Sequence, residues 1–272
     1  MAPPKAPPPP PRSAATVPQQ TDPSRFAITS GRIASPQRIV LYGTGGIGKT
    51  SLAALAPNPV FLDLEHGTEE LDVQRIQLDG WDDLRACLQS DKLEGFSTVV
   101  IDGGTKAQEL AEAHTIATVP HEKGHRINRI EDYGFGKGLS HVYETYLLLL
   151  QDLDTQVRRG RNVILIAHDC ISEFPNPSGD NFIRYEPHLQ APKSGKASIR
   201  NRVIQWASHV LFVGYDVAAT REGKGVGSGT RTIHTCEMPT HVAKTRGGDS
   251  VPATMPFVQG DGAIWDLVLG GK

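Results

Sequence analysis

The sequence predicts an α/β fold: a mostly parallel, doubly wound sheet with helices on both faces and an antiparallel hairpin extension near the C-terminal end. Continuous apolar runs, such as residues 60–64 and 162–167, are typical of strands that are buried on both faces. Segments with helical character alternate with these runs, which favours parallel strands joined by helices. In the last third of the chain, shorter strands are separated by glycine-rich turns, which indicates hairpin strands added to one edge.

The elements follow from apolar runs, helical periodicity and turn residues. The predicted strands are 39–42, 60–64, 97–102, 162–167, 210–213, 231–236 and 241–243, with an edge strand starting at 26–28. The predicted helices are 51–56, 81–89 and 139–158, and Gly160 is placed to end the last of them.

The N-terminal segment differs in composition from the rest of the chain. Nine of the first 23 residues are proline, so this segment has few backbone donors and little apolar surface to bury. We expect residues 1–24 to form a disordered tail, either a solvated spacer or a ligand for a proline-binding partner. Residues 25–272 are predicted to form a single domain.

Composition limits the classes of protein to which the chain can belong. The formal net charge is −2, so a nucleic-acid-binding function would depend on local basic patches. Cys87, Cys170 and Cys236 have neither disulfide-framework nor zinc-site spacing, which favours a reducing compartment. No run reaches the length of a membrane span and no apolar signal region is present, so we expect a cytoplasmic protein without membrane contact.

The most informative motif follows the first core strand. An apolar strand runs into G-x-x-x-x-G-K-T, and a helix-forming segment comes next, which is the context of a P-loop. Its backbone N–H groups form an anion nest, Lys49 is expected to reach the β- and γ-phosphates of ATP, and Thr50 to hold Mg²⁺. The predicted nucleotide-binding residues are Gly43, Thr44, Gly45, Gly46, Ile47, Gly48, Lys49, Thr50 and Ser51.

Polar residues at the ends of other predicted strands point to the same cleft. Asp102 ends an apolar strand in the manner of a Walker B motif, so we expect it to hold Mg²⁺ together with Thr50. Asp63 and Glu65 end the second strand, and either could orient the attacking water or serve as a helix N-terminal acid. His168 ends the strand at 162–167, where it could contact the γ-phosphate or bond to local backbone.

The segment 61–67, Phe-Leu-Asp-Leu-Glu-His-Gly, closely resembles the part of RecA-type recombinases that carries their catalytic glutamate. The order of P-loop, acid-bearing strand, Walker B and polar sensor also matches, and the segment 242–246 resembles the basic segment that crosses a RecA subunit interface. The segment 132–138 and the strand end at 166–168 resemble the core-only RecA-like ATPases of bacteriophage recombination systems, which include single-strand annealing proteins. The resemblance covers about residues 25–257.

The resemblance implies roles that spacing alone does not provide. Glu65 would activate water, His168 would act as the sensor, and Lys244 and Arg246 would act on the phosphates of a neighbouring subunit. The protein would therefore form a homo-oligomer, a ring or a filament, with ATP at the subunit interfaces. Its implied partners are single-stranded DNA and a single-strand-binding protein, in the cytoplasm of a bacterial host cell.

Two long polar segments are the predicted DNA-facing loops, one between Asp102 and Leu139 and one from Cys170 to about Arg202. Both combine basic with aromatic residues, which suits the phosphates and bases of single strands. The predicted DNA-binding residues are Arg126, Arg129, Lys137, Lys193, Lys196, Arg200 and Arg202.

Two departures from RecA proteins and two rival functions remain. Gly103 follows Walker B where a small hydroxyl residue is usual, and no separate N-terminal domain precedes the core. The first rival is a P-loop kinase or another NTPase that acts on a small molecule. The second is a helicase loader or an ATP-gated scaffold that depends on a protein partner.

Overall fold

The structure is a computed structural model that describes residues 28, 30–31, 33–219, 225–246 and 248–270. The chain divides into two compact units, Met1–Ile33 and Ala34–Lys272. In the first unit the described residues carry no helix or strand, and Ile28 is fully exposed. The edge strand expected at 26–28 is therefore absent at Ile28. The rest of that strand and the predicted tail at 1–24 lie outside the described residues.

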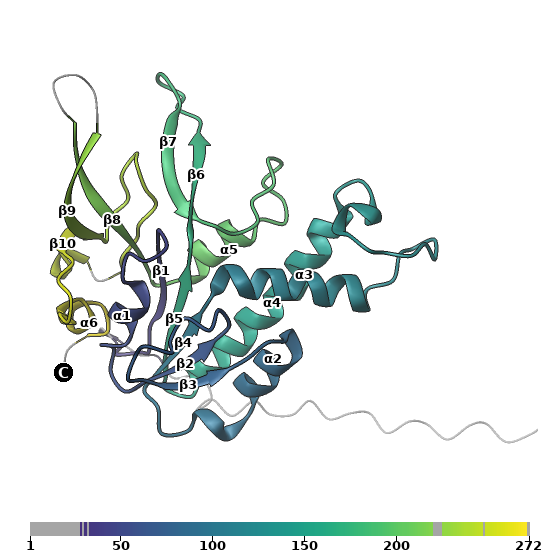
Figure 1. The fold of residues 1–272 in the computed structure, drawn as a ribbon, viewed down its shortest axis with the longest axis horizontal. Coiled ribbons are helices and arrows are strands. Elements are labelled where there is room, and N and C mark those ends of the chain that lie inside the picture. Colours follow the sequence, from purple (N-terminus) through teal and green to yellow (C-terminus); the bar gives the residue numbers. More distant parts are fainter. Residues whose placement is uncertain (1–27, 29, 32, 220–224, 247, 271–272) are drawn as a thin grey trace, which may run out of the picture. The chain divides into compact units, whose positions relative to one another are not determined.

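The second unit contains alternating strands and helices, followed by a strand-rich C-terminal part (Figure 1). In chain order its described elements are β1 (Arg38–Gly43), α1 (Lys49–Ala53), β2 (Pro59–Asp63), β3 (Gln74–Gln77), α2 (Trp81–Gln89), η2 (Asp91–Leu93), β4 (Thr98–Asp102), α3 (Gly104–Thr118), η3 (Ile130–Tyr133), α4 (Lys137–Arg158), β5 (Asn162–Ala167), β6 (Asp169–Phe174), β7 (Phe182–Pro187), α5 (Ile199–Trp206), β8 (His209–Ala219), β9 (Gly225–His234), η4 (Gly248–Ser250), β10 (Thr254–Pro256) and α6 (Ala263–Val268).

One eight-stranded sheet organises this unit, with the strand order β10-β9-β8-β1-β5-β4-β2-β3. Neighbours from β3 to β8 run parallel, whereas β9 and β10 run antiparallel to their neighbours. The strands β6 and β7 form a separate antiparallel ribbon that follows β5 directly. The predicted fold class, a mostly parallel α/β sheet with antiparallel strands added at one edge, is confirmed.

Helices cover both faces of the sheet because the apolar side chains of its strands alternate between two cores. In β1, Val40 and Tyr42 belong to the core formed with α2, α3, α4 and α5, while Ile39 and Leu41 belong to the core formed with α1 and α6 (Figure 1). All four side chains have no exposed surface. Burying a side chain of this size contributes about 1.5–3 kcal/mol, so these two cores provide the main stabilisation of the sheet.

The strands predicted at 39–42, 60–64, 97–102 and 162–167 are confirmed to within one residue at each end, and the helix predicted at 81–89 coincides with α2. The helix predicted at 51–56 ends earlier, at Ala53, shortly before Pro57. No helix in the described part of the chain has both the length and the apolar character that crossing a bilayer requires.

The first predicted loop is wrong over much of its length, because α3 occupies its beginning. The buried side of α3 consists of small residues, Gly104, Ala107, Ala111 and Thr115. These residues allow the helix to pack closely without the large apolar side chains from which a helix is usually predicted. The open part of this segment is therefore restricted to about residues 119–129.

The second predicted loop also contains regular secondary structure. The ribbon of β6 and β7 accounts for its first half, and α5 begins at Ile199, before the predicted end of the loop. The strand expected at 241–243 is replaced by isolated pairings, Tyr185 with His241 and Val210 with Lys244. This segment runs between the ribbon and β8, so it pairs with each of them at one residue only.

Candidate nucleotide-binding site

The glycine-rich loop at 43–48 lies between β1 and α1, in tight contact with the C-terminal part of the chain. Gly48 has a φ of +105°, in the left-handed region, and a Cβ there would lie 2.8 Å from Phe257 Cζ. A Cβ on Gly43 would lie 2.3 Å from the carbonyl oxygen of Val213. Both positions therefore require glycine, for conformation or for space, and the loop keeps the compact path of a phosphate-binding loop.

Lys49 is buried at the start of α1, with 7% of its surface exposed. Its Nζ donates hydrogen bonds to the carbonyl oxygens of Gly43 and Thr44, at 2.8 and 2.9 Å. Burial lowers the pKa of the ammonium group, while the charges of Asp169 and Asp102 act in the opposite direction. The lysine is thus held across the loop in the position expected of a phosphate-binding cation.

Asp102 lies at the C-terminal end of β4 and is 4% exposed. Burial raises its pKa to about 6, a hydrogen bond with the Thr50 side chain opposes this, and the nearby charges of Glu65 and Asp63 add to the rise. Its Oδ2 is buried and has no hydrogen-bond partner among the described residues. A hydroxyl and a carboxylate with a free oxygen are suitable ligands for Mg²⁺, so Thr50 and Asp102 fit the predicted metal site.

Asp63 and Glu65, the two candidate acids, have different environments. Asp63 is fully buried and accepts hydrogen bonds from the backbone N–H groups of Glu65, Gly67 and Thr68 and from the Thr68 hydroxyl. Burial opposes its ionisation, but these bonds outweigh burial and lower its pKa. Asp63 therefore shapes the turn after β2, while Glu65 is free to extend into the cleft.

Glu65 and His168 meet at the C-terminal edge of the sheet. His168 Nε2 lies 3.3 Å from Glu65 Oε2, and the two side chains are 42% and 32% exposed. One residue follows β2 and the other follows β5, so the parallel strands bring together side chains that are 103 positions apart. This edge of the sheet thus combines a carboxylate that can orient water with an imidazole that can form hydrogen bonds.

The backbone conformation of Gly103 and the nearby Glu65 side chain explain why a glycine directly follows Asp102. Gly103 has a φ of +114°, and a Cβ there would lie 2.9 Å from Glu65 Cγ. The hydroxyl that the RecA resemblance leads one to expect at this position occurs two residues later. Thr105 Oγ1 accepts from the backbone N–H of His168 at 3.3 Å and donates to the His188 carbonyl at 3.1 Å. Thr105 therefore links the start of α3, directly after β4, to the backbone of His168 and His188.

Two charged residues near the P-loop were not recognised in the sequence. Asp169 is the largest electrostatic influence that raises the pKa of Lys49. Arg231, on β9, donates from Nη1 to the Ile47 carbonyl at 2.8 Å, and its guanidinium lies 4.2 Å from the centre of the Phe257 ring. Asp169 directly follows His168 and could have been considered, but no local signal connects Arg231 with a loop 184 positions earlier.

Lys244 and Arg246 lie away from the P-loop of their own chain. Lys244 pairs with Val210, which is next to Val40 near the start of β1, whereas the P-loop follows the end of β1. Lys244 Nζ donates to the Ile204 carbonyl at 2.5 Å, and Arg246 is exposed. Action of these two residues on phosphates in trans stays a prediction.

The predicted DNA-binding residues fall into two groups in the structure. The exposed cations are Arg126, Arg129, Lys137, Lys193, Lys196 and Arg202, of which Lys137 forms an ion pair with Glu122 at 2.6 Å. Arg200 is different, because only 12% of its side chain is exposed and its guanidinium is bonded within the chain.

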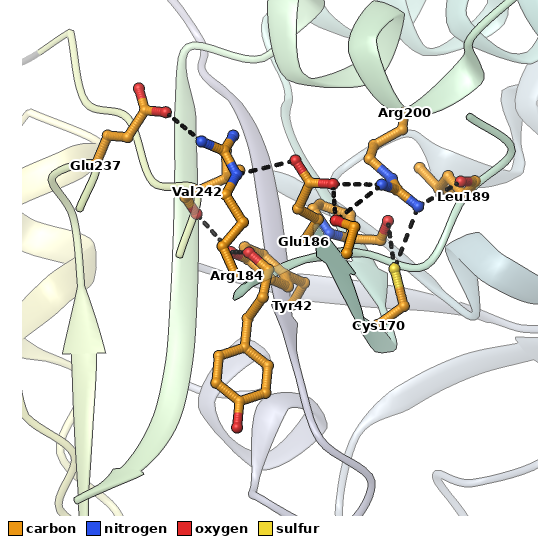
Figure 2. A network of polar contacts seen from close by, with 11 residues as sticks. Tyr42, Cys170, Arg184, Glu186, Leu189, Arg200, Glu237 and Val242 are labelled. Atoms are coloured by element: carbon orange, nitrogen blue, oxygen red, sulfur yellow. Dashed lines mark hydrogen bonds and ion pairs between the residues drawn. The ribbon is translucent and has the colours of Figure 1, made fainter. Parts of the chain in front are cut away.

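A polar network fixes the base of the ribbon to α5 and β1, as Figure 2 shows. Glu186 binds both Arg184 and Arg200, and Arg200 Nη2 also lies 3.2 Å from Cys170 Sγ. The hydroxyl of Tyr42, on β1, is directed at the backbone carbonyls of Val242 and of Tyr185 in the ribbon, at 2.6 and 3.1 Å. Burial raises the pKa of Glu186, but hydrogen bonding and the two arginines outweigh burial and lower it overall.

Because Arg200 is a buried partner of Glu186, we expect Arg200→Ala to lower the free energy of unfolding by about 2–4 kcal/mol. Glu186 would keep Arg184 but lose its second cation. Urea denaturation measures the change. The control is Arg202→Ala, an exposed arginine on the same helix, for which we expect a change within about 0.5 kcal/mol. Equal effects of the two substitutions would contradict a structural role of the network.

Comparison with known proteins identifies a matching family and similar solved structures. A family model described as "AAA domain" matches residues 35–247. Among solved structures, the chain is similar to a KaiC-like protein, PH0186, from the hyperthermophilic archaeon Pyrococcus horikoshii OT3. That match has a TM-score of 0.46 and 16% identity, and it covers 84% of this chain and 88% of the other. No curated protein sequence matches the chain.

Proposed function

The chain belongs to the AAA domain family of P-loop ATPases, and from this premise we propose that it is a RecA-type ATPase that binds single-stranded DNA when ATP is bound. We place its activity in phage DNA recombination or strand annealing, in the cytoplasm of the host cell. Two observations support this function: the nucleotide site of the described fold, and the resemblance of the segment 61–67 to RecA-type recombinases.

The contact between Glu65 and His168 is the observation that carries the proposal. The two side chains meet 3.3 Å apart beside a P-loop lysine and a buried Walker B aspartate. The next residue after His168, Asp169, begins the ribbon of β6 and β7. A change in the contacts of His168 during hydrolysis could therefore reach the ribbon directly through the backbone.

Each residue of the site has its own proposed role in ATP hydrolysis. Lys49 would bind the β- and γ-phosphates, and Thr50 and Asp102 would hold Mg²⁺, which supplies charge neutralisation at the phosphates when it is bound. Glu65 would orient and polarise the attacking water, and His168 would hydrogen-bond the γ-phosphate. ATP would stabilise the DNA-binding state of the ribbon, and loss of the γ-phosphate would release the DNA.

The position of Lys244 and Arg246 supports a homo-oligomer. They lie at the opposite end of β1 from the P-loop, so neither residue is placed to contact nucleotide bound to its own chain. In a ring or filament they would contact ATP held by the neighbouring subunit, where cations stabilise the charge that develops during phosphoryl transfer. A single-strand-binding protein is a further partner of this proposed assembly.

The first test is ATP hydrolysis measured with and without poly-dT. We expect single-stranded DNA to stimulate turnover, duplex DNA to have little effect, and Lys49→Ala to give no turnover with either. Stimulation by single strands alone would support the proposal. Turnover that is indifferent to DNA, without ATP-dependent DNA binding, would instead favour a small-molecule NTPase or a partner-dependent scaffold.

The segment before α5 supplies the clearest test of the DNA contacts. Lys193 and Lys196 are both exposed, so we expect Lys193→Glu with Lys196→Glu to weaken binding to poly-dT at least tenfold. Loss of two phosphate contacts should also lower the slope of log affinity against log salt by about 1.4. Fluorescence anisotropy at several salt concentrations measures both quantities.

Lys92→Glu is the matched control, since Lys92 is an exposed lysine in η2, outside both predicted DNA-binding segments. It should leave affinity for poly-dT and the salt slope nearly unchanged. If the double variant behaves like this control, the segment before α5 does not bind DNA.

A further inference from the structure

A cavity of about 510 Å³ lies beside the P-loop, with Thr44 and Ile47 in one wall. The other walls come from the ribbon, from β8 and β9, and from the segment that joins β9 to the C-terminal part of the chain. This volume is in the range of sites that bind small molecules or parts of larger ligands. The cavity is thus large enough for one heterocyclic base.

Five aromatic side chains line the cavity, Tyr185, Phe212, Tyr215, His234 and His241. Phe212 stacks on Tyr185, with ring centres 5.2 Å apart and planes at 19°, and on His241, at 5.2 Å and 26°. His234 stacks on the same ring at 5.6 Å and 24°. Tyr185 and Tyr215 are 40% and 51% exposed, so aromatic surface is also accessible where the cavity meets solvent. Such a lining favours a flat, aromatic ligand.

One polar atom of the lining is left without a partner. His241 is 4% exposed, and its Nε2 is buried with no hydrogen-bond partner among the described residues. Its Nδ1 lies 3.1 Å from Thr240 Oγ1, so the unpaired atom is on the other side of the ring. Burial and the neighbouring His234 lower the pKa of His241 to about 4. His241 therefore adds a neutral aromatic ring, and no charge, to the wall of the cavity.

The negative charge of Asp169 limits which flat ligands the cavity can bind. Asp169 contributes a carboxylate to the lining, which repels phosphate groups but accepts hydrogen bonds from amino groups. The same carboxylate raises the pKa of Lys49, so it is electrostatically coupled to the phosphate-binding lysine. The cavity therefore suits a base with an exocyclic amino group and is connected to the nucleotide site.

The position of the cavity favours DNA over ATP as the source of this base. The ribbon, which directly follows His168, contributes Asp169 and Tyr185 to the lining of the cavity. The outer face of the ribbon continues from Tyr185 to Ile171 and Ile183, which are 65% and 71% exposed. An apolar, accessible path thus leads along the ribbon into the cavity.

We propose that this cavity binds one unpaired base of single-stranded DNA, preferring a base with an exocyclic amino group, and that its occupation changes ATP turnover through Thr44 and Asp169. This inference rests on the proposed DNA-binding function. It adds a defined base site to that function, next to the phosphate-binding loop.

The test uses a dT oligonucleotide with a single central 2-aminopurine deoxynucleotide, a fluorescent base with an exocyclic amino group, added to the full chain with Mg²⁺ and a non-hydrolysable ATP analogue. Wild-type protein should quench the fluorescence of this base. Tyr185→Ala with Tyr215→Ala should remove most of the quenching and weaken binding about tenfold. Phe174→Ala is the matched control, because Phe174 is 43% exposed on the other face of the same ribbon and does not line the cavity. The Phe174→Ala protein should quench the fluorescence of the base as strongly as the wild type does.

The outcomes separate this inference from the proposed function. Binding and quenching that are unchanged in the tyrosine variant would overturn the base site and leave DNA binding intact. No binding of any oligonucleotide by wild-type protein would overturn the proposed function and the base site together. A third experiment measures the fluorescence of the triphosphate of 2-aminopurine riboside when it is added to the protein without DNA. If the tyrosine variant abolishes quenching of that compound, the cavity holds the base of the nucleotide, and the inference is wrong.

Discussion

Lys49→Ala should weaken ATP binding by about 100-fold or more and abolish turnover. The side chain is buried and already held over the P-loop carbonyls, so its ammonium group is pre-positioned for the phosphates. Removing the partner of a buried, hydrogen-bonded charge costs about 2–5 kcal/mol, which corresponds to this loss. Binding of a fluorescent ATP analogue and release of inorganic phosphate measure the two effects.

Lys92→Ala serves as the control for Lys49→Ala, since Lys92 is an exposed lysine in η2. It should bind and hydrolyse ATP like the wild type. Circular dichroism and the urea midpoint show whether Lys49→Ala remains folded, because this change also removes two hydrogen bonds to the loop. A folded Lys49→Ala protein with normal ATP affinity would refute the P-loop assignment.

Glu65→Gln should retain ATP binding and lose hydrolysis by about 10²–10⁴-fold, the usual contribution of a general base. Glutamine keeps the size of the side chain, and the turn after β2 is held by Asp63, so the cleft should keep its shape. Only the carboxylate that faces His168 is removed. Single-turnover hydrolysis, with ATP affinity measured separately, distinguishes loss of chemistry from loss of binding.

Glu69→Gln is the matched control, an exposed glutamate four residues further along the same segment. We expect it to bind and hydrolyse ATP normally. If Glu65→Gln retains turnover at the level of this control, another group activates the water. If it loses ATP affinity as well, Glu65 contributes to binding instead.

The sheet and the P-loop could be predicted because their signals are local. Strands such as β1 and β5 are continuous apolar runs, and the spacing of glycine, lysine and threonine in the P-loop is contiguous in the sequence. Asp102 was predicted because it directly ends such a strand. The helix α3 could not be predicted, also for a local reason. Its buried side has only small residues, so its sequence lacks the large apolar residues that distinguish a helix from a polar loop.

The choice between Asp63 and Glu65 required the tertiary structure. In the sequence both acids end the same strand, and spacing does not separate them. In the fold, both carboxylate oxygens of Asp63 accept hydrogen bonds within the turn that follows β2. Glu65 occupies the space next to Gly103, where a Cβ atom would collide with its side chain. The difference is one of hydrogen bonding and close packing, neither of which is encoded in a short motif.

The sequence by itself therefore determined the fold class, the P-loop motif and the position of Asp102 at the end of a buried strand, because each depends on residues within one short segment. Only the tertiary structure decided that Arg200 is bonded to Glu186, that Arg231 contacts the P-loop, and that His241 lines a cavity beside it. Burial and charge depend on neighbours in space, and here those neighbours are up to 184 positions away in the chain.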